Sequence, residues 1–241
     1  MLQGFYKVRF QLDEAAGRSV MYAHAGRMLG GNSAFAHIGT YQESGDELTA
    51  EVTTLRHHAT PGYRPLVGID EATLVLRGRA EADGVHFDGT LVELPGSVFR
   101  SVMTPIDEEI TPAGGAVGEG GIANGLYSID MRLQDGIDGG LSGVMLLNDG
   151  RILGGDAFFY YIGSYTSANG RWKGQMLNQE HTPARDAYRV FGGHEVGIGF
   201  SGSCDDQGAR LEATALAGKR SLRLTADLKL VRRAQEPIPN A

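Results

Sequence analysis

The stretches that decide the fold are Gly26-Arg27-Met28-Leu29-Gly30-Gly31 and Gly150-Arg151-Ile152-Leu153-Gly154-Gly155, because they are one motif that occurs twice at a displacement of 124 residues. The same displacement pairs Ile38-Gly39-Thr40-Tyr41 with Ile162-Gly163-Ser164-Tyr165 without a gap. It also pairs single residues in the two halves: His57 with His181, Gly78 with Gly202, and Gly84 with Gly208. Self-similarity at a fixed displacement over most of a chain indicates two copies of one structural unit.

The boundaries of the two copies follow from where the match begins and ends. Gly4-Phe5-Tyr6 matches Gly125-Leu126-Tyr127, so we predict a first domain at residues 1–105 and a second at 125–233. The segment between them, residues 106–124, is acidic, rich in glycine and without an apolar period, which predicts a flexible linker. The formal net charge is −3 for residues 1–105, −4 for 106–124 and 0 for the rest, so the copies differ electrostatically.

Apolar and polar residues alternate with a period of two in both copies, as half-buried strands require. Phe5 to Phe10 is one such segment, and Asn148-Asp149-Gly150 between two apolar runs is a strong hairpin signal. We find no sustained period of 3.6 residues. About eight short strands joined mostly in sequence predict an all-β chain of two tandem eight-stranded antiparallel barrels, because closure removes exposed sheet edges. A sandwich of two sheets is the competing architecture.

Composition excludes several classes of protein. A formal net charge of −7 argues against a nucleic-acid partner, since such proteins present a basic face. Cys204 is the only cysteine, so no intramolecular disulfide and no cysteine-based zinc cluster is expected. No apolar run approaches the roughly 20 residues of a membrane helix, and no signal-peptide pattern begins the sequence. We therefore expect no membrane partner and a cytoplasmic location.

The order of three motifs in the second copy resembles the GrlR family, the lipocalin-like negative regulators of type III secretion. These motifs are Asn-Gly-Leu-Tyr-Ser-Ile at 124–129, Asp-Gly-Arg-Ile-Leu-Gly-Gly-Asp at 149–156 and Tyr-Tyr-Ile-Gly-Ser-Tyr at 160–165. The first copy carries weaker versions of all three. The resemblance implies lipocalin-like (calycin-type) barrels with apolar interiors and a tendency to dimerise, here within the chain or between chains. It also implies inhibition of a transcriptional activator by direct binding.

The resemblance further implies that an acidic loop contacts the partner. In the first copy this loop is 43–47, and Glu43, Asp46 and Glu47 are the expected partner-binding residues. The second copy has Ser-Ala-Asn-Gly-Arg at 167–171 and lacks the acidic character. Only the first half is therefore expected to supply the contact.

A second group of candidate residues is the aromatic run Phe158, Phe159, Tyr160 and Tyr161. On a strand, alternate residues of this run face opposite sides, so one pair fills the barrel and the other is available for an interface. The sequence leaves open which pair is which.

Other motifs carry a structural interpretation. His57 and His181 stand where a strand leaves the barrel, and a ring bonded to backbone is favoured over a metal site. The two Gly-Gly pairs each precede a strand rather than a helix, which argues against a phosphate-binding loop. No hydrolytic set is recognisable. We therefore expect no catalytic residues, no metal and no cofactor.

These observations favour a non-enzymatic regulatory protein that binds another protein, and the resemblance implies that this partner is a transcriptional regulator. The alternative is a binding protein for a small apolar ligand in the barrel interior, since eight strands enclose either packed side chains or one small molecule.

Overall fold

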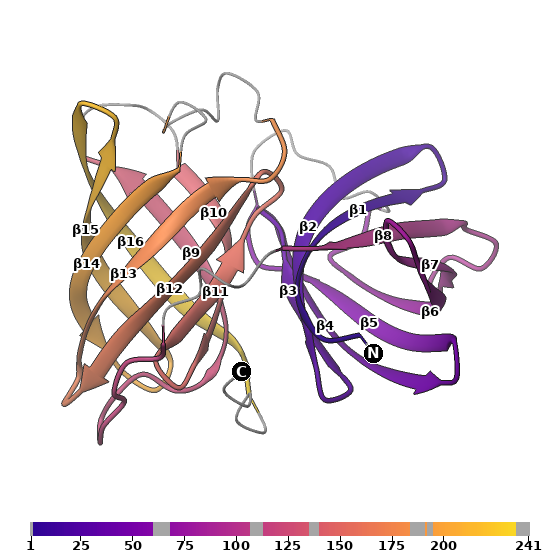
Figure 1. Cartoon of the computed structure of the whole chain (residues 1–241), viewed down its shortest axis with the longest axis horizontal. Helices are drawn as coiled ribbons and strands as arrows, with labels where there is room; N and C mark the ends of the chain where they lie inside the picture. The colour runs from indigo at the N-terminus through magenta and orange to yellow at the C-terminus, as the bar shows by residue number, and fades with distance from the viewer. Residues whose placement is uncertain are drawn as a thin grey trace. The chain divides into compact units, whose positions relative to one another are not determined.

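The computed structural model describes residues 2–59, 68–106, 113–134, 140–183, 191 and 195–234. Within these residues the secondary structure consists of sixteen strands and no helix, so no helix there could span a membrane. The chain divides into two compact units, residues 1–108 and 109–241. Each unit contains a closed antiparallel barrel of eight strands (Figure 1), which confirms the predicted fold class and excludes the sandwich.

The strands of the first barrel pair in sequence order, and β1 closes the sheet by pairing with β8. They are β1 (Gly4–Leu12), β2 (Ala15–His24), β3 (Arg27–Gly31), β4 (Phe35–Ser44), β5 (Glu47–Arg56), β6 (Glu71–Glu81), β7 (Gly84–Leu91) and β8 (Phe99–Pro105).

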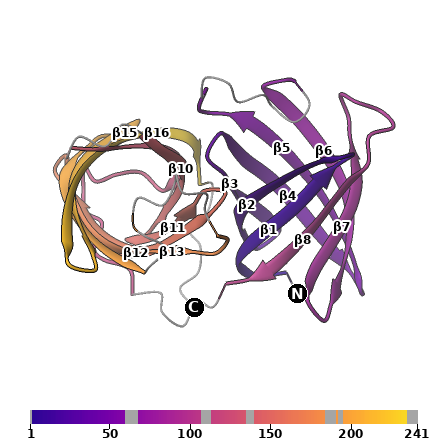
Figure 2. The same ribbon diagram turned by 90° about the horizontal axis from the view of Figure 1, so that it is seen from above.

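The second barrel has the same up-and-down order, and β16 closes the sheet by pairing with β9. Figure 2 shows its strands arranged in a ring. They are β9 (Gly125–Leu133), β10 (Gly140–Asn148), β11 (Arg151–Gly155), β12 (Phe159–Ala168), β13 (Arg171–Glu180), β14 (Val196–Cys204), β15 (Gly208–Ala217) and β16 (Arg220–Arg233).

Strand register shows that the two barrels are copies at the level of individual residue pairs. Val20 is paired with Gly31 in the first barrel, and Val144 with Gly155 in the second, so both partners shift by the same 124 positions. The repeat detected in the sequence is therefore a repeat of backbone geometry. Alternate residues of each strand enter the core, as in β5, where Leu48, Ala50 and Val52 are buried.

The Gly-Gly pairs, which the sequence placed before a strand, are themselves the last two residues of strands β3 and β11. Gly30 and Gly154 lie in β3 and β11, where the neighbouring strand approaches very closely. A Cβ atom on Gly154 would lie 2.4 Å from the carbonyl oxygen of Val144, and one on Gly30 would lie 2.1 Å from that of Val20. Glycine is present because no side chain fits between these backbones.

Aromatic rings on inward-facing positions cover glycines of the neighbouring strand. A Cβ on Gly78 would lie 2.5 Å from the ring of Phe87, and one on Gly174 would lie 2.7 Å from the ring of Phe200. In the second barrel the Phe200 ring also packs against Trp172 with centroids 4.6 Å apart. Large rings thus occupy space that the small residues leave along the inner wall.

The segment predicted as a flexible linker is hydrogen-bonded along its described part. Ile106 donates its N–H to Phe5 in the first barrel, at 2.8 Å. Residues 113–124 run along the second barrel, where Gly118 donates to the carbonyl of Ser167 at 2.8 Å and Asn169 donates to that of Glu119 at 2.8 Å. The glycines here provide close approach to the barrel rather than freedom of movement, since a Cβ on Gly115 would meet a backbone oxygen at 2.2 Å. Residues 107–112 lie outside the described part.

Replacing Gly154 by alanine tests the close-approach argument. We expect the free energy of unfolding of the second barrel to fall by about 2 kcal/mol, because the added methyl group forces β10 and β11 apart. Trp172 is the chain's only tryptophan and lies in this barrel's core, so its fluorescence during urea unfolding provides the measurement.

Gly199→Ala is the matched control. Gly199 is exposed on β14, has no heavy atom within 4 Å of an added Cβ, and should gain up to about 0.5 kcal/mol from the stiffer residue. Equal losses of stability in both variants would contradict a steric role for Gly154.

Candidate functional site

The predicted acidic loop is the tip of the hairpin that joins β4 to β5. Gly45 takes a φ of 62° in the turn, which glycine adopts without strain. Glu43, Asp46 and Glu47 are all exposed. The carboxylates of Asp46 and Glu47 make no hydrogen bond or ion pair within the described residues. Their charges are therefore available to a partner.

Glu43 differs from its two neighbours because it holds another segment in place. Its Oε1 accepts a hydrogen bond from the N–H of Leu2, and the hydroxyl of Tyr41 donates to the carbonyl of Leu2. Leu2 is only 2 % exposed and belongs to the first barrel's core, where it covers one end. Glu43 is thus a structural residue as well as a surface charge.

The second barrel has the same end closure with a different acceptor. Ile122 is 2 % exposed within the core, and its N–H donates to Oγ of Ser167 at 3.2 Å. Ser167 occupies the position equivalent to Glu43, so the hydroxyl replaces the carboxylate as the acceptor. The loss of acidic character in the second copy therefore leaves the end closure intact.

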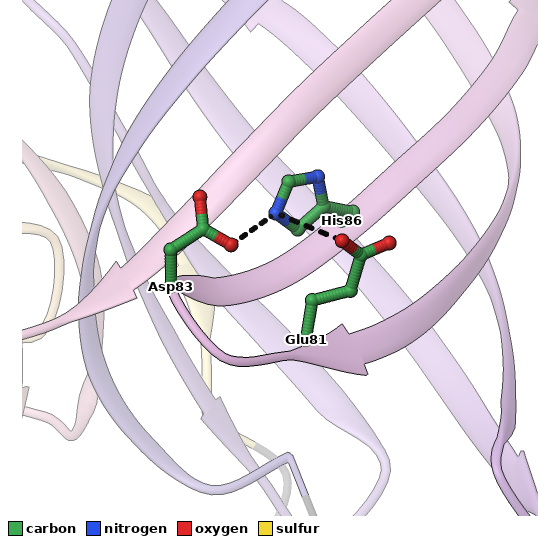
Figure 3. A group of neighbouring side chains, drawn as sticks. All are labelled: Glu81, Asp83 and His86. Atoms are coloured by element: carbon green, nitrogen blue, oxygen red, sulfur yellow. Dashed lines mark hydrogen bonds and ion pairs between the residues drawn. The ribbon is translucent and has the colours of Figure 1, made fainter.

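A cluster that the sequence analysis did not identify lies on the neighbouring hairpin of the first barrel, between β6 and β7. The carboxylates of Glu81 and Asp83 converge on the ring of His86 (Figure 3). Nε2 of His86 is 2.7 Å from Oδ1 of Asp83 and 3.9 Å from Oε2 of Glu81. The hydrogen bond with His86 is the main reason that the pKa of Asp83 lies below its usual value. The signal was Glu-x-Asp-Gly-x-His across a predicted turn.

This cluster has ligand atoms of the kinds that divalent transition metals take, all within 4.8 Å of one another. Its groups are already partnered, however. Arg79 Nε lies 2.9 Å from Glu81, and His86 bonds Asp83. Both acids are exposed, so the arrangement is explained as a surface ion-pair network that needs no ion.

The two hairpin tips form one acidic rim at the same end of the first barrel. β5 begins where β6 ends, and Glu47 is directly paired with Arg79 in the register. We use "acidic rim" for the exposed carboxylates on these tips: Glu43, Asp46, Glu47, Glu81 and Asp83. Basic groups near these carboxylates include Arg79, His86 and Arg9, and the five carboxylates of the rim outnumber them.

The aromatic run of the second barrel divides as the strand period requires. Phe159 and Tyr161 face the interior and are fully buried in the core. Phe158 is half-buried and also packs against the core, while half-buried Tyr160 donates its hydroxyl to Oε1 of Gln179 on the paired strand. Tyr160 is therefore the residue of the run whose side chain faces away from the interior, while Phe158 precedes β12 and packs against the core.

A buried carboxylate organises the turn that precedes this run. Oδ1 of Asp156 accepts hydrogen bonds from the N–H groups of Phe158 at 2.7 Å and Phe159 at 2.8 Å, and Oδ2 accepts from the hydroxyl of Tyr161 at 3.2 Å. Removal from water raises the pKa of Asp156 to about 6, although these three donors favour the charged form.

The repeated histidines bind the backbone of this same turn in each barrel. Nε2 of His57 lies 3.0 Å from the carbonyl oxygen of Asn32, and Nε2 of His181 lies 3.3 Å from that of Asp156. The interpretation of both histidines as turn residues is confirmed. Asn32 replaces Asp156 in the first copy, and its Oδ1 accepts from the N–H groups of Ala34 and Phe35.

The interior position occupied by Tyr161 holds His37 in the first barrel. His37 is buried, and its ring meets that of Phe10 edge-on with centroids 6.3 Å apart. Loss of hydration lowers the pKa of His37 to about 4, and the nearby His57 contributes in the same direction. The copies therefore bury a base in one barrel and an acid in the other at equivalent ends.

Comparisons with known proteins add little. No protein-family model and no curated protein matches the sequence. Two solved structures align over 95 % of this chain and 96 % of their own, each at 8 % identity. One is a candidate outer membrane protein from Bacteroides fragilis with a TM-score of 0.26, and the other is a protein of unknown function in the DUF3598 family from Nostoc punctiforme with a TM-score of 0.22. These likenesses are too distant to support a function.

Glu43→Ala tests the structural role of this acid. We expect the free energy of unfolding of the first barrel to fall by about 1 kcal/mol, because the N–H of Leu2 loses its acceptor. Hydrogen exchange at the Leu2 amide should accelerate, as measured by NMR. Glu43→Gln keeps an acceptor oxygen and should restore most of the stability and protection. Unchanged exchange in the alanine variant would show that the carboxylate does not hold this segment.

Asp156→Asn tests the buried acid by copying the first barrel's residue. An acid with a raised folded-state pKa stabilises the fold below its unfolded value near 4, and this contribution is lost as pH rises to about 6. The wild-type second barrel should thus lose roughly 2 kcal/mol more than the variant between pH 4 and pH 7. Urea unfolding followed by Trp172 fluorescence measures the difference. Parallel pH profiles would rule out a carboxyl that titrates near 6.

Proposed function

We propose that this chain is a non-enzymatic binding protein whose first barrel binds a basic surface of a partner protein through the acidic rim. The observation that carries the proposal is the exposure of Asp46 and Glu47 on a hairpin tip with no interaction inside the described part of the chain. Charged groups that the fold does not use are free to steer a partner and set its orientation.

The neighbouring hairpin extends the same charge. Glu81 and Asp83 stand beside Glu47 because β5 and β6 are paired, so a partner that approaches one tip also meets the other. Interactions between exposed charges reach about 10 Å at ordinary ionic strength, which lets these groups act together. The partner surface is expected to present lysine or arginine.

The contact belongs to the first barrel alone. The equivalent tip of the second barrel is Ser-Ala-Asn-Gly-Arg at 167–171, and Asp206 on its neighbouring turn already pairs with Arg233 at 3.3 Å. A duplicated scaffold with one acidic rim suits a partner that binds at one end rather than two equal partners.

The positions of the other titratable groups support binding rather than catalysis. Asp156, His57 and His181 are engaged in turns, and the aromatic run fills or covers the second core. The role proposed here is that of GrlR-like regulators, which sequester a transcriptional activator by direct contact.

Neutralising the two free carboxylates tests the proposal. Proteins captured from the source cell's extract on the wild-type chain are identified, purified and measured by calorimetry. We expect Asp46→Asn/Glu47→Gln to weaken the binding of the true partner at least tenfold, because two complementary charge pairs are lost. Binding by the wild-type chain should also weaken as salt is raised from 50 to 300 mM.

The matched control is Glu51→Gln/Glu71→Gln, which removes the same charge from exposed positions on β5 and β6 away from the tips. This control should bind within twofold of the wild-type chain. Equal affinities for the rim variant and the control would remove the rim from the interface. Glu43 is left intact because its removal also releases Leu2.

A further inference from the structure

The interior of the second barrel contains a polar pair, Tyr161 and Asn178, in a core that also buries Tyr127 and Tyr165. Tyr161 on β12 and Asn178 on β13 are register partners, so their side chains share a face of the sheet. Tyr161 belongs to the core, and Asn178 follows the core residue Met176 by two positions. Both side chains therefore face the interior. Asn178 is 1 % exposed.

The two members of the pair differ in their hydrogen bonding. The hydroxyl of Tyr161 donates to Oδ2 of Asp156 at 3.2 Å. Nδ2 of Asn178 is inaccessible to solvent and has no acceptor. A buried donor without an acceptor costs about 1–3 kcal/mol, so native proteins rarely keep one without a reason.

The shared scaffold does not require an amide here. The equivalent residue of the first barrel is Thr54, which is half-buried on β5, and Tyr161 is replaced there by His37. The two copies keep the same register at this site, since His37 pairs with Thr54 as Tyr161 pairs with Asn178. A fully buried amide without an acceptor is therefore specific to the second copy, since the first barrel has the half-buried hydroxyl of Thr54 at this place.

We propose that the second barrel binds a small, largely apolar molecule with a neutral carbonyl oxygen, which accepts a hydrogen bond from Nδ2 of Asn178. The apolar body would contact the neighbouring core residues Met176, two positions along β13, and Val196, the register partner of Asn178 on β14. The interior of an eight-stranded barrel is filled by side chains or holds one small ligand, so the molecule must be small. This binding is independent of the acidic rim.

The charge of the ligand follows from Asp156. Its carboxylate is buried and bonded to Tyr161, the register partner of Asn178. An anionic head group beside Asn178 would meet this charge in a region of low polarity, where repulsion is poorly screened. A ketone, ester or amide is favoured over a carboxylate of the same shape.

Three molecules of nearly identical shape test the inference with the full chain: acetophenone, isopropylbenzene and benzoate. Calorimetry at pH 7.5 should show one acetophenone bound per chain. Isopropylbenzene should bind about fivefold more weakly because it lacks the acceptor, and benzoate at least tenfold more weakly because of its charge. Asn178→Leu should remove the preference for acetophenone over isopropylbenzene, and Asn178→Val provides a second variant without the donor.

The controls separate a specific site from general apolar binding. Thr54→Val at the equivalent place in the first barrel should leave all three affinities unchanged. Asp156→Asn should strengthen benzoate binding at least fivefold. The inference is overturned if acetophenone does not bind up to its solubility limit, if its preference over isopropylbenzene survives in both Asn178 variants, or if benzoate binds as tightly as acetophenone to the wild-type chain.

Discussion

Closure of each sheet on itself is the constraint from which the other features follow. In the first barrel β1 pairs with both β2 and β8, and in the second β9 pairs with both β10 and β16, so neither sheet has a free edge. Closing a ring of eight strands fixes the curvature, and curvature requires close backbone contacts at Gly30 and Gly154. A closed barrel also has an interior, so every second residue of each strand must pack there against its neighbours.

Much of this architecture can be predicted from sequence because short-range residue patterns indicate it. Alternation identifies strands, and the match of Gly26–Gly31 with Gly150–Gly155 identifies the duplication. The Gly-rich segment before β9 shows why a linker prediction from composition is incomplete. Glycine provides both flexibility and close approach, and composition alone cannot distinguish them. Gly115 and Gly118 provide close approach, as their contacts with the β12–β13 hairpin show.

The candidate sites depend on which residues are paired between neighbouring strands, and this pairing cannot be predicted from the sequence alone. Glu81 and Asp83 join the predicted acidic loop only because β5 and β6 are neighbours in the sheet. Asn178 becomes notable only when its register partner Tyr161 and the missing acceptor are both known. Conversely, the turn role of His57 and His181 can be predicted from residue type and from position at the end of a strand, whereas the acidic loop as a partner contact is what the family resemblance implies.

Duplication freed individual positions to diverge while the backbone stayed the same. Glu43 and Ser167 are equivalent, and each accepts a hydrogen bond from the residue that precedes its barrel, although only Glu43 is charged. Asn32 and Asp156 are also equivalent, and each accepts hydrogen bonds from backbone N–H groups of the same turn, although only Asp156 is an acid. Interior chemistry diverged as well, with His37 in one copy and Tyr161 in the other. The backbone that both barrels share provides their stability. The side chains that differ between them account for any difference in function.

Leu2 and Ile122 stand just before the first strand of their respective barrels, and each is the cap that covers its own core. The repeated unit therefore starts before its first β-strand and includes the residue that covers its core. Each unit thus brings its own residue for this position. A single barrel that keeps this residue is expected to retain the contact without help from the other barrel.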